Sequence, residues 1–531
     1  MENLLFDELG RTMAVTSDES SKHRIRGKEC IKANIEIVRS IASLLSTSLG
    51  PNGMDKVLQS PDDDITVTND GATILQCMEM TENPVSKLIV DLSKAQDDEI
   101  GDGTTSVVVL AGALLTEASK LLERGMHPIR IAAGFEKAFR LAKSHLSSIS
   151  EDISGTDILR QAARTSLGSK IVAKALDHFS SLCTEAVLAV ADQERGDVDF
   201  ELIKIESKIG RDISDTKLIH GVVLSKEFSH PQMQRSIEDA HIAVLACPFE
   251  PPKLKTKHDL KISNVEEYEK LDGYEKEKFE EMITCVKQSG ANLVICQWGF
   301  DDEANSMLME HSLPAIRWVG GAELEQVAVH TGAQIISRFI DLKKEDLGHA
   351  SVHEEPLGTE DDHIIVVENG VGKTVTILVR GGNNMAIEEA KRSIHDALCA
   401  VRNLIKNKRI VYGGGSNEIS CSIFLEKQAG MLKGEERECV LGFGKALEEI
   451  PLCLAKNSGY SGVGYISEIR RKQIEENNHF IGVDCFENGK TNMKECGVFD
   501  TLNGKIHQLA MATQLVTMIL KIDDVIIGEN Q

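Results

Sequence analysis

The chain is poor in aromatic residues and in positive charge. Only 4% of its 531 residues are aromatic, with two Trp, whereas 41% are hydrophobic. Packing must therefore come mainly from Ala, Leu, Ile and Val side chains, in about three domains by length. The formal net charge is −24, and binding to nucleic acids or membrane surfaces depends on basic patches. We therefore expect neither as a partner, and an acidic cytoplasmic protein is favoured.

Metal-ligand spacing and long apolar runs are also missing. The twelve Cys are scattered from Cys30 to Cys496, with no C-x-x-C pair and no clustered Cys/His spacing. We therefore expect reduced thiols and neither a zinc site nor a disulfide framework. The first residues show no basic segment followed by an apolar one, so no signal peptide is expected. No apolar run is expected to reach the roughly 20 residues that span a bilayer.

What the sequence does contain is a glycine-rich turn, GDGTT at residues 101–105, directly before the apolar run 106–115. The run predicts a buried helix, whose free N–H groups and dipole favour an anion at the turn. Glycine permits close approach of a phosphate, and Thr104 and Thr105 can donate hydrogen bonds to it. Asp102 would repel phosphate unless a Mg²⁺ ion lay between them. A tight turn with a helix cap explains these five residues equally well.

Residues 30–150 show mostly helical periodicity. Glycine and proline interrupt it at 49–53 and 125–128, as expected at helix ends. Between these breaks, residues 65–71 predict a strand that ends in an Asn-Asp-Gly turn. Apolar residues at helical spacing from Ile129 to Leu146 predict an amphipathic helix.

After about residue 197, strand-like segments alternate with helices, which is typical of an α/β domain. Within this region, residues 248–290 open with Pro251-Pro252-Lys253 and continue as a helix of mixed charge, which favours a solvated protrusion. Residues 385–406 predict a long amphipathic helix, and helices then continue to a strand-like 518–522. Because helical segments at both ends enclose an α/β insert, we expect the two ends to form one shared domain. The strand-like segments are 200–205, 219–224, 240–247 and 292–296.

Two further glycine-rich turns and one acid are candidates for the same chemistry. The turns are 49–53 and 413–415, where a ligand could approach the backbone closely. A plain turn or a flexible joint remains the alternative for each. Asp396 lies at the margin of the apolar stripe of its helix and could orient water toward a γ-phosphate. An ordinary acid on a helix face is the simpler interpretation from spacing alone.

The segment Gly372-Lys373-Thr374 looks like the end of a P-loop. The first glycine of that motif would have to be residue 367, which is Val367. The flanking segments 364–370 and 374–379 instead predict two strands joined by an Asn-Gly turn, whereas a P-loop needs strand, loop and helix. We therefore reject a P-loop.

Taken together, these motifs resemble those of the chaperonins in order and approximate spacing. The charged helical insertion in 248–290 resembles the built-in lid of the group II chaperonins (TCP-1 family). Four further segments resemble one subunit type of the eukaryotic cytosolic chaperonin, CCT or TRiC. The resemblance covers nearly the whole chain, about residues 6–524. The segments that carry it are 49–56, 68–73, 101–105, 413–415 and, for the subunit type, 197–204, 228–233, 247–253 and 296–305.

The resemblance implies an α/β multidomain chaperonin fold. A mostly helical equatorial domain would hold both chain ends, a small α/β intermediate domain would be built from two segments, and an α/β apical domain would carry a helical protrusion. The expected boundaries are 1–150 and 408–531 for the equatorial domain, 151–216 and 374–407 for the intermediate domain, and 217–373 for the apical domain, with the protrusion near 248–290.

The resemblance also implies which residues act on a nucleotide. Asp102 resembles the Mg²⁺ ligand, while Asp396 and Asp70 resemble the acids that activate the attacking water. ATP or ADP and Mg²⁺ are the implied cofactors, with K⁺ as a further candidate ion. The implied nucleotide-binding residues are Leu49, Gly50, Pro51, Gly103, Thr104, Thr105, Ser169, Gly413, Gly414, Asp484, Asp500 and Lys505.

By the same resemblance, the chain would be an ATPase and a subunit of an ATP-dependent molecular chaperone in the cytoplasm. Related subunits, eight per ring, would form a hetero-oligomeric double ring whose closure folds clients such as actin and tubulin. Met307 to Met309 and the acids around them could contact the client, or could simply belong to the core. A stand-alone kinase would need an acceptor site, for which we find no residues. A scaffold without hydrolysis would not need Asp102, Asp396 and the glycine turns together.

The sequence departs from the family pattern at three places. Lys456 stands where many members have an acid, and Asp500 stands where this subunit type has Glu. Residues 426–437 fit the family poorly, and we assign no site to them. Both single departures are compatible with nucleotide binding, although local contacts in a ring could differ.

Overall fold

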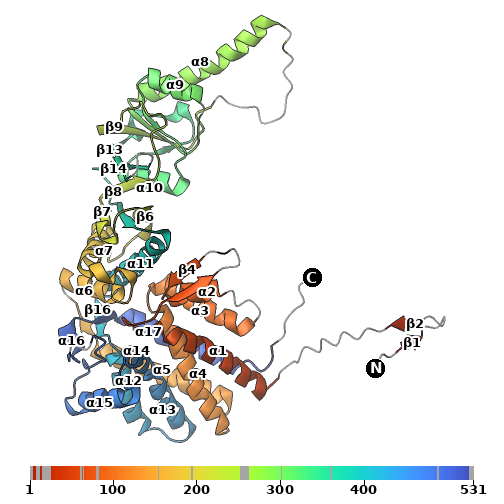
Figure 1. Ribbon diagram of the computed structural model, residues 1–531, viewed down its shortest axis with the longest axis vertical. Coiled ribbons are helices and arrows are strands. Elements are labelled where there is room, and N and C mark those ends of the chain that lie inside the picture. The colour runs from red at the N-terminus through yellow and green to blue at the C-terminus, as the bar shows by residue number, and fades with distance from the viewer. Residues whose placement is uncertain are drawn as a thin grey trace.

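The computed structural model shows an elongated chain with separate hydrophobic cores along its long axis (Figure 1). A helical base lies at one end, a smaller middle body follows, and a sheet with a projecting helix lies at the other end. The structure describes residues 4–6, 12–14, 26–59, 63, 65–78, 83–153, 155–192, 195–250, 262, 264–300, 302–358, 362–486 and 489–525.

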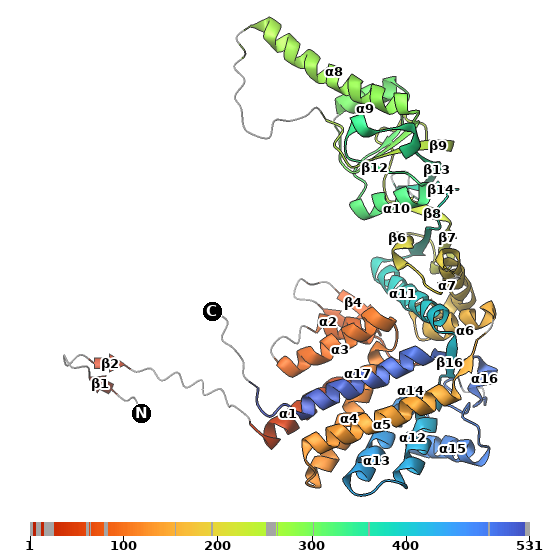
Figure 2. The same cartoon turned by 180° about the vertical axis from the view of Figure 1, so that it is seen from behind.

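The helical base is built from segments near both ends of the chain. Figure 2 shows the last helix, α17 (Leu502–Leu520), running beside α4 (Thr104–Glu123) and α5 (Pro128–Ile149). Side chains from these segments share one core, in which the rings of Phe135 and Phe443 meet edge-on at 5.8 Å. The other helices of the base are α1 (Lys28–Ser46), α2 (Gly71–Cys77), α3 (Pro84–Ile100), α12 (Ser416–Ala429), α13 (Glu435–Leu447), α14 (Glu449–Asn457), α15 (Gly462–Glu475) and α16 (Met493–Cys496).

Short strands complete this end of the molecule. The antiparallel pair β3 (Lys56–Gln59) and β4 (Ile65–Thr68) leads into α2. A second small sheet places β16 (Arg409–Tyr412) between β17 (Phe499–Thr501) and β5 (Glu151–Asp152). Near the N-terminus, β1 (Leu4–Phe6) pairs antiparallel with β2 (Thr12–Ala14).

Helix α4 is the centre of the base and explains the longest apolar stretch of the sequence. It has 20 residues, and an 18-residue window within it has a mean hydropathy of 1.5, so by length and composition it could cross a membrane. The expectation that no apolar run reaches this length is therefore wrong. Within the chain 61% of that window is buried, and the helix packs against α1, α13 and α17. A helix that is covered on most sides is apolar nearly all round, so the core accounts for this composition.

The middle body combines a short sheet with three helices. Its sheet has the order β6 (Ile203–Ile209), β15 (Val375–Gly381), β7 (Lys217–Ile219), with β15 parallel to β6 and antiparallel to β7. The helices are α6 (Thr156–Leu167), α7 (Leu176–Val190) and α11 (Asn384–Lys406). The predicted amphipathic stripe of α11 is confirmed, because Ile387, Ala390, Ile394 and Val401 are buried in this core.

The far end is an α/β unit around one mixed sheet. The strand order is β11 (Ala315–Ile316), β10 (Leu293–Cys296), β9 (Ser236–Leu245), β13 (Gly348–Pro356), β14 (His363–Glu368), β8 (Gly221–Leu224), and β12 (Ile335–Ile336) also pairs with β9. Three helices accompany the sheet: α8 (Val265–Ser289), α9 (Asp302–Glu310) and α10 (Gly321–Thr331).

Helix α8 lies where the sequence predicts a charged helical protrusion. Phe279, Ile283 and Val286 near its C-terminal end are buried in the sheet unit, while its first half projects away from the body in both views (Figures 1 and 2). Pro251-Pro252-Lys253 lies outside the described residues. On the neighbouring α9, Leu308 is fully buried, and Met307 and Met309 pack partly buried against the same core. This favours the core interpretation of these three residues.

Four local predictions are wrong. Residues 364–368 and 375–379 do form strands, but β14 and β15 lie in different sheets and do not pair as a hairpin. The Asn-Asp-Gly segment after β4 is no turn, because Asp70 caps α2, which begins at Gly71. Residues 518–520 belong to the end of α17 and not to a strand, since Ile519 and Leu520 are buried in the core of the helical base. Ile129, expected on the buried face of α5, is exposed.

Candidate functional site

The glycine-rich turn at residues 101–105 joins α3 to α4 with two glycines in the left-handed backbone region. Gly101 has φ 71° and Gly103 has φ 79°, which residues with a side chain rarely adopt. A Cβ atom on Gly101 would also lie 2.4 Å from Sγ of Cys399 on α11. Because α4 begins at Thr104 and Gly103 has no capping side chain, the first N–H groups of the helix are available to an anion.

The Asp70 carboxylate is fixed beside this turn by three hydrogen bonds that it accepts. As the N-cap of α2 it accepts from the Thr73 N–H at 3.0 Å and the Thr73 hydroxyl at 2.8 Å. Its other oxygen accepts from the Thr104 hydroxyl at 2.7 Å. Burial acts to raise the pKa of Asp70, but the charge of Lys170 and these hydrogen bonds hold it below the usual value. Asp70 is therefore an ionised group locked in one orientation.

Asp396 comes from α11 and pairs with Lys170. The Lys170 Nζ lies 2.5 Å from Asp396 Oδ2, and the two side chains are only 9% and 14% exposed. Burial raises the pKa of Asp396, the Lys170 charge lowers it, and the negative charges of Asp70 and Asp102 raise it again, so that the net shift is upward. Asp396 is therefore a better proton acceptor than an ordinary carboxylate. In this structure, however, one of its oxygens pairs with Lys170.

Asp102 lies in the middle of a group of acids. Its side chain is open to solvent on one side, yet the surrounding protein and the charge of Asp500 raise its pKa, with Lys170 opposing the shift. Burial and the charge of Asp70 raise the pKa of Asp97, on the last turns of α3, to about 6. Burial is the main cause of both raised pKa values and repulsion among the acids adds to it, so a cation bound among these carboxylates would be favoured.

A cavity next to Asp102 connects the turn with the C-terminal part of the chain. Asp102, Gly103, Asp500 and Lys505 all line it, from both ends of the sequence. Lys505 Nζ lies 2.8 Å from Oε1 of Glu418 and 3.2 Å from Oδ2 of Asp500. Burial lowers the pKa of Lys505, but Asp500 and Glu418 raise it more strongly. Lys505 is therefore a fixed positive charge that is already shared between two acids.

The glycine-rich turns at residues 49–53 and 413–415 form a second side of the candidate site and carry other predicted nucleotide residues. Gly413 packs so closely that a Cβ would lie 3.2 Å from Asp500 Oδ2. The Gly414 carbonyl accepts a hydrogen bond from the Val483 N–H at 2.8 Å, which places it beside Asp484.

The glycine-rich turn at residues 49–53, in the N-terminal part of the chain, lies beside Cys485, next to Asp484. The Asn52 side chain donates to the Cys485 carbonyl at 2.6 Å, and Asn457 donates to the Leu49 carbonyl at 2.8 Å. Gly50 has φ 88°, and a Cβ on it would lie 2.4 Å from Leu454. Pro51, which follows it, is half-buried in the turn. The turn is thus held against residues 454–458 and 484–485.

The described residues fit a magnesium-bound nucleotide. Asp484 is buried, and its Oδ2 has no hydrogen-bond partner among the described residues, so it can accept from a ligand hydroxyl. At the other side, carboxylates of raised pKa stand beside helix N–H groups, the arrangement that a hard cation and a phosphate require together.

Ser169 supports the site through its backbone. Its carbonyl accepts a hydrogen bond from the Asn69 amide at 2.5 Å, so its position ties the segment after α6 to the residue before Asp70, and its contact with a nucleotide stays a prediction. The side chain that reaches the acids is that of the next residue, Lys170, which sequence reasoning missed. A lysine directly after Gly168-Ser169 was the available signal.

Comparison with known proteins gives the class to which this fold and site belong. The model of the TCP-1/cpn60 chaperonin family matches residues 41–530, and the chain belongs to this family. It is 64% identical to T-complex protein 1 subunit epsilon of Encephalitozoon cuniculi over 99% of both chains. It is also 40% identical to thermosome subunit beta of Aeropyrum pernix, over 95% of this chain and 92% of the relative.

A further thermosome subunit, from Methanocaldococcus jannaschii, is 39% identical over 96% of this chain and 94% of its own length. The similarity to the epsilon subunit confirms the subunit type that residues 197–204, 228–233, 247–253 and 296–305 indicate. The chain is thus a group II chaperonin subunit with ATP-dependent chaperone function, and it is an ATPase.

Proposed function

We propose that this chain binds Mg-ATP at the N-terminus of α4 and hydrolyses it with Asp396 as the proton acceptor. One observation carries the proposal: Asp70, Asp102, Asp396 and Lys170 converge from four separate segments, and each affects the pKa of another. A structural ion pair needs two partners. A group of three acids and one lysine at a helix N-terminus matches the needs of phosphoryl transfer.

The proposed roles follow from the position of each group. Asp102 would hold Mg²⁺, which when bound neutralises charge on the phosphate oxygens. Gly103, Thr104 and Thr105 would bind phosphates through N–H and hydroxyl groups, and Asp70 would position the attacking water together with Asp396. The residues proposed for the rest of the nucleotide are Leu49, Gly50, Pro51, Gly413, Gly414, Asp484, Asp500 and Lys505, with Ser169 holding the loop that carries Lys170.

Lys170 gives this site two states. In the present arrangement it neutralises Asp396 at 2.5 Å. A γ-phosphate offers Lys170 a second anionic partner, which frees an Asp396 oxygen to accept a proton from water. The water oxygen then bonds to the γ-phosphorus while the bond to the β–γ bridging oxygen breaks, and ADP and phosphate result.

The proposed acid and the proposed metal ligand belong to different bodies, which would couple hydrolysis to movement. Asp102 stands in the helical base, whereas α11 packs in the middle core. Hydrolysis would therefore require the middle body to hold α11 against the turn, a gating step of the hinge type. The three largest cores support the equatorial, intermediate and apical domains at 1–150 with 408–531, 151–216 with 374–407, and 217–373, and two smaller clusters lie where these bodies meet.

The assembly and its substrates complete the proposal. The 64% identity to a T-complex protein 1 subunit supports a hetero-oligomeric, cytoplasmic double ring with eight related subunits per ring. Its clients would include actin and tubulin, enclosed when the protrusion near α8 covers the ring opening. Replacing K⁺ by Na⁺ in the assay would test whether K⁺ is specifically needed as well.

The decisive test is Asp396→Ala in the assembled complex, compared with Glu388→Gln on an exposed position of the same helix. We expect hydrolysis by this subunit to be lost, about 10²-fold or more, with ATP affinity nearly unchanged, while Glu388→Gln leaves both intact. An equal loss of affinity would contradict the water-activating role. Unchanged turnover would favour a subunit that binds nucleotide without needing Asp396.

The metal role has its own test. Asp102→Ala should weaken binding of ATP in the presence of Mg²⁺ but change binding of ATP without Mg²⁺ much less. Titration with a fluorescent nucleotide in the two conditions measures this difference. Equal Mg²⁺-dependence in the variant and in the unmodified chain would refute the assignment of Asp102 as a ligand.

A further inference from the structure

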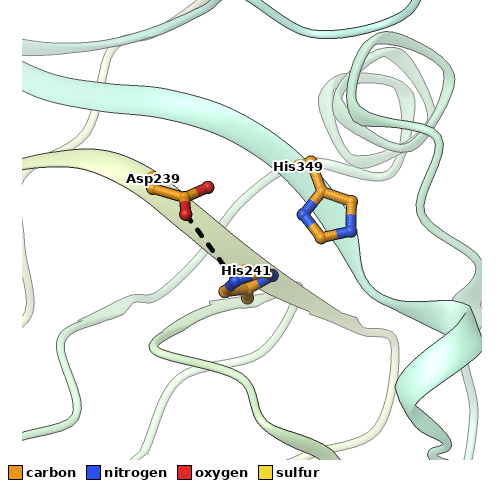
Figure 3. A group of neighbouring side chains, drawn as sticks. All are labelled: Asp239, His241 and His349. Carbon is orange, nitrogen blue, oxygen red and sulfur yellow. Dashed lines mark ion pairs between the residues drawn. The ribbon is translucent and has the colours of Figure 1, made fainter.

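Three side chains with metal-binding groups meet on the sheet at the far end of the molecule, well separated from the nucleotide site. They are Asp239 and His241 on β9 and His349 on β13 (Figure 3). Their potential ligand atoms all lie within 4.8 Å of one another. The sequence could not show this group, because the two histidines are distant in the chain and no short spacing links them.

The geometry follows from strand pairing. His349 and His241 are directly opposite each other in the antiparallel pair of β13 and β9, where side chains of facing residues lie close together. Their ring centroids are 4.6 Å apart at an interplanar angle of 81°. The Asp239 carboxylate lies 4.0 Å from Nε2 of His241.

Alternation along β9 places the Asp239 carboxylate beside the histidines. Side chains two residues apart in a strand point to the same face of the sheet, and Asp239 precedes the partly exposed His241 by two residues, with the buried Ala240 between them. Next to this pair, the register of β9 against β13 shifts between Ala350 and Val352, and Glu238 and Asp239 are both exposed. An irregularity of this kind is common at functional positions.

One polar residue fixes the backbone of both β9 ligands. The side chain of Asn292 accepts from the His241 N–H at 2.7 Å and donates to the Asp239 carbonyl at 2.9 Å. The Asn292 N–H also donates to the His241 carbonyl at 3.0 Å. The backbone on which the group stands is thus held in place, while the exposed side chains can rotate.

We propose that Asp239, His241 and His349 form a surface site for a divalent transition-metal ion of the Zn²⁺ type. Two imidazoles and one carboxylate are a donor set that zinc sites use, with water in the remaining position. Tetrahedral ligands of zinc stand about 3.3 Å apart, given bonds of about 2.0 Å. The ligand atoms lie within 4.8 Å of one another, so a modest approach of these side chains would complete the coordination. The bound ion would link β9 to β13 and so stabilise this unit by mass action.

The test is titration of the full-length, EDTA-treated chain with Zn²⁺ by isothermal calorimetry, with Co²⁺ absorption as a second probe of coordination. The chain has other His and Cys residues, so the readout is the difference between variants. We expect His349→Ala and His241→Ala each to lose one equivalent of Zn²⁺ and the corresponding Co²⁺ band. His220→Ala is the matched control, since His220 is 62% exposed and lies outside the group.

Two further variants keep the test decisive if a histidine replacement disturbs folding. Asp239→Asn preserves the size of the side chain and removes its charge. It should lower the affinity for the Zn²⁺ ion at this site at least 10-fold. Asn292→Ala retains every ligand but frees the backbone, and we expect a loss of about 10-fold, as for other supporting residues of metal sites. Equal Zn²⁺ stoichiometry and affinity in His349→Ala, Asp239→Asn and His220→Ala would overturn the proposal.

Discussion

Two buried lysines of this chain are each shared between acids, yet they belong to different kinds of network. Lys505 contacts Glu418 and Asp500, and all three stand in the helical base. Lys170 contacts Asp396 of the middle body and acts on Asp70 of the base through its charge. A network within one body is fixed by packing, whereas one that reaches across two bodies can change when they move. The comparison separates Lys505, a charge fixed within one body, from Lys170, a charge whose partners can change.

Removing the lysine of the base should have the largest effect. Lys505→Met leaves Glu418 and Asp500 as an uncompensated pair of acids, with Glu418 only 6% exposed. Breaking a buried ion pair in this way costs about 4 kcal/mol. Denaturant unfolding without nucleotide measures the change, with exposed Lys521→Met on the end of α17 as the control. Similar stability of the two variants would remove the distinction between the lysines.

The contact between the two bodies can be tested at the glycine turn. Gly101→Ala combines a left-handed backbone with a Cβ placed 2.4 Å from Cys399, and should cost about 3 kcal/mol. Gly125→Ala has φ 88° but nothing within 4 Å of the new Cβ, so it should cost about 1 kcal/mol. The difference between the two losses of unfolding free energy measures the contribution of the close packing of α11 against the turn. Equal costs would show that Gly101 is needed only for its backbone angle.

Removing the other lysine should cost less stability and change the pH dependence of hydrolysis. In Lys170→Met, Asp396 can take up a proton because its pKa is already raised, which limits the loss to about 2 kcal/mol. Since Lys170 lowers the pKa of Asp396, its removal raises that pKa further. The ionised form then exists only at higher pH, and the acid limb of the kcat profile moves upward. Lys174→Met, an exposed neighbour, should leave the profile unchanged.

The smallest expected effect has the opposite sign. The pKa of Asp97 is raised to about 6, so its ionisation is more costly in the folded chain than in the unfolded one. The folded state therefore loses stability as the pH rises from about 4 to 6. Asp97→Asn removes this loss and should stabilise the metal-free chain by about 1 kcal/mol at pH 7. The comparison is with exposed Asp98→Asn, and equal stability of the two variants at pH 7 would contradict the expectation.

Local signals in the sequence located most of the proposed site. The helix after residues 101–105, the helix that carries Asp396 and the break before α5 all begin within a few residues of the predicted positions. These features depend on apolar periodicity and on glycine and proline, which act within one turn of the chain. The family resemblance added the residues that no periodicity marks, such as Asp484, whose buried Oδ2 is consistent with a ligand contact.

Other features depended on contacts between distant segments. The apolar segment 518–520 ends a helix because that helix completes the base, and the strands flanking Asn369-Gly370 separate because each finds its partners in a different sheet. Lys170 stood next to a predicted residue, but only folding shows that its charge reaches Asp396 and Asp70. Likewise, β-strand pairing brings His241 to His349.

The sequence by itself determined the family, the helix ends and the residue types at the phosphate turn, because these are set by local chemistry and by long motifs. The tertiary structure alone decided which charges meet. Two side chains interact through space over a few ångströms, and a linear sequence does not specify that distance. The pairing of Lys170 with Asp396, the sharing of Lys505 and the grouping of Asp239 with two histidines are therefore properties of the fold.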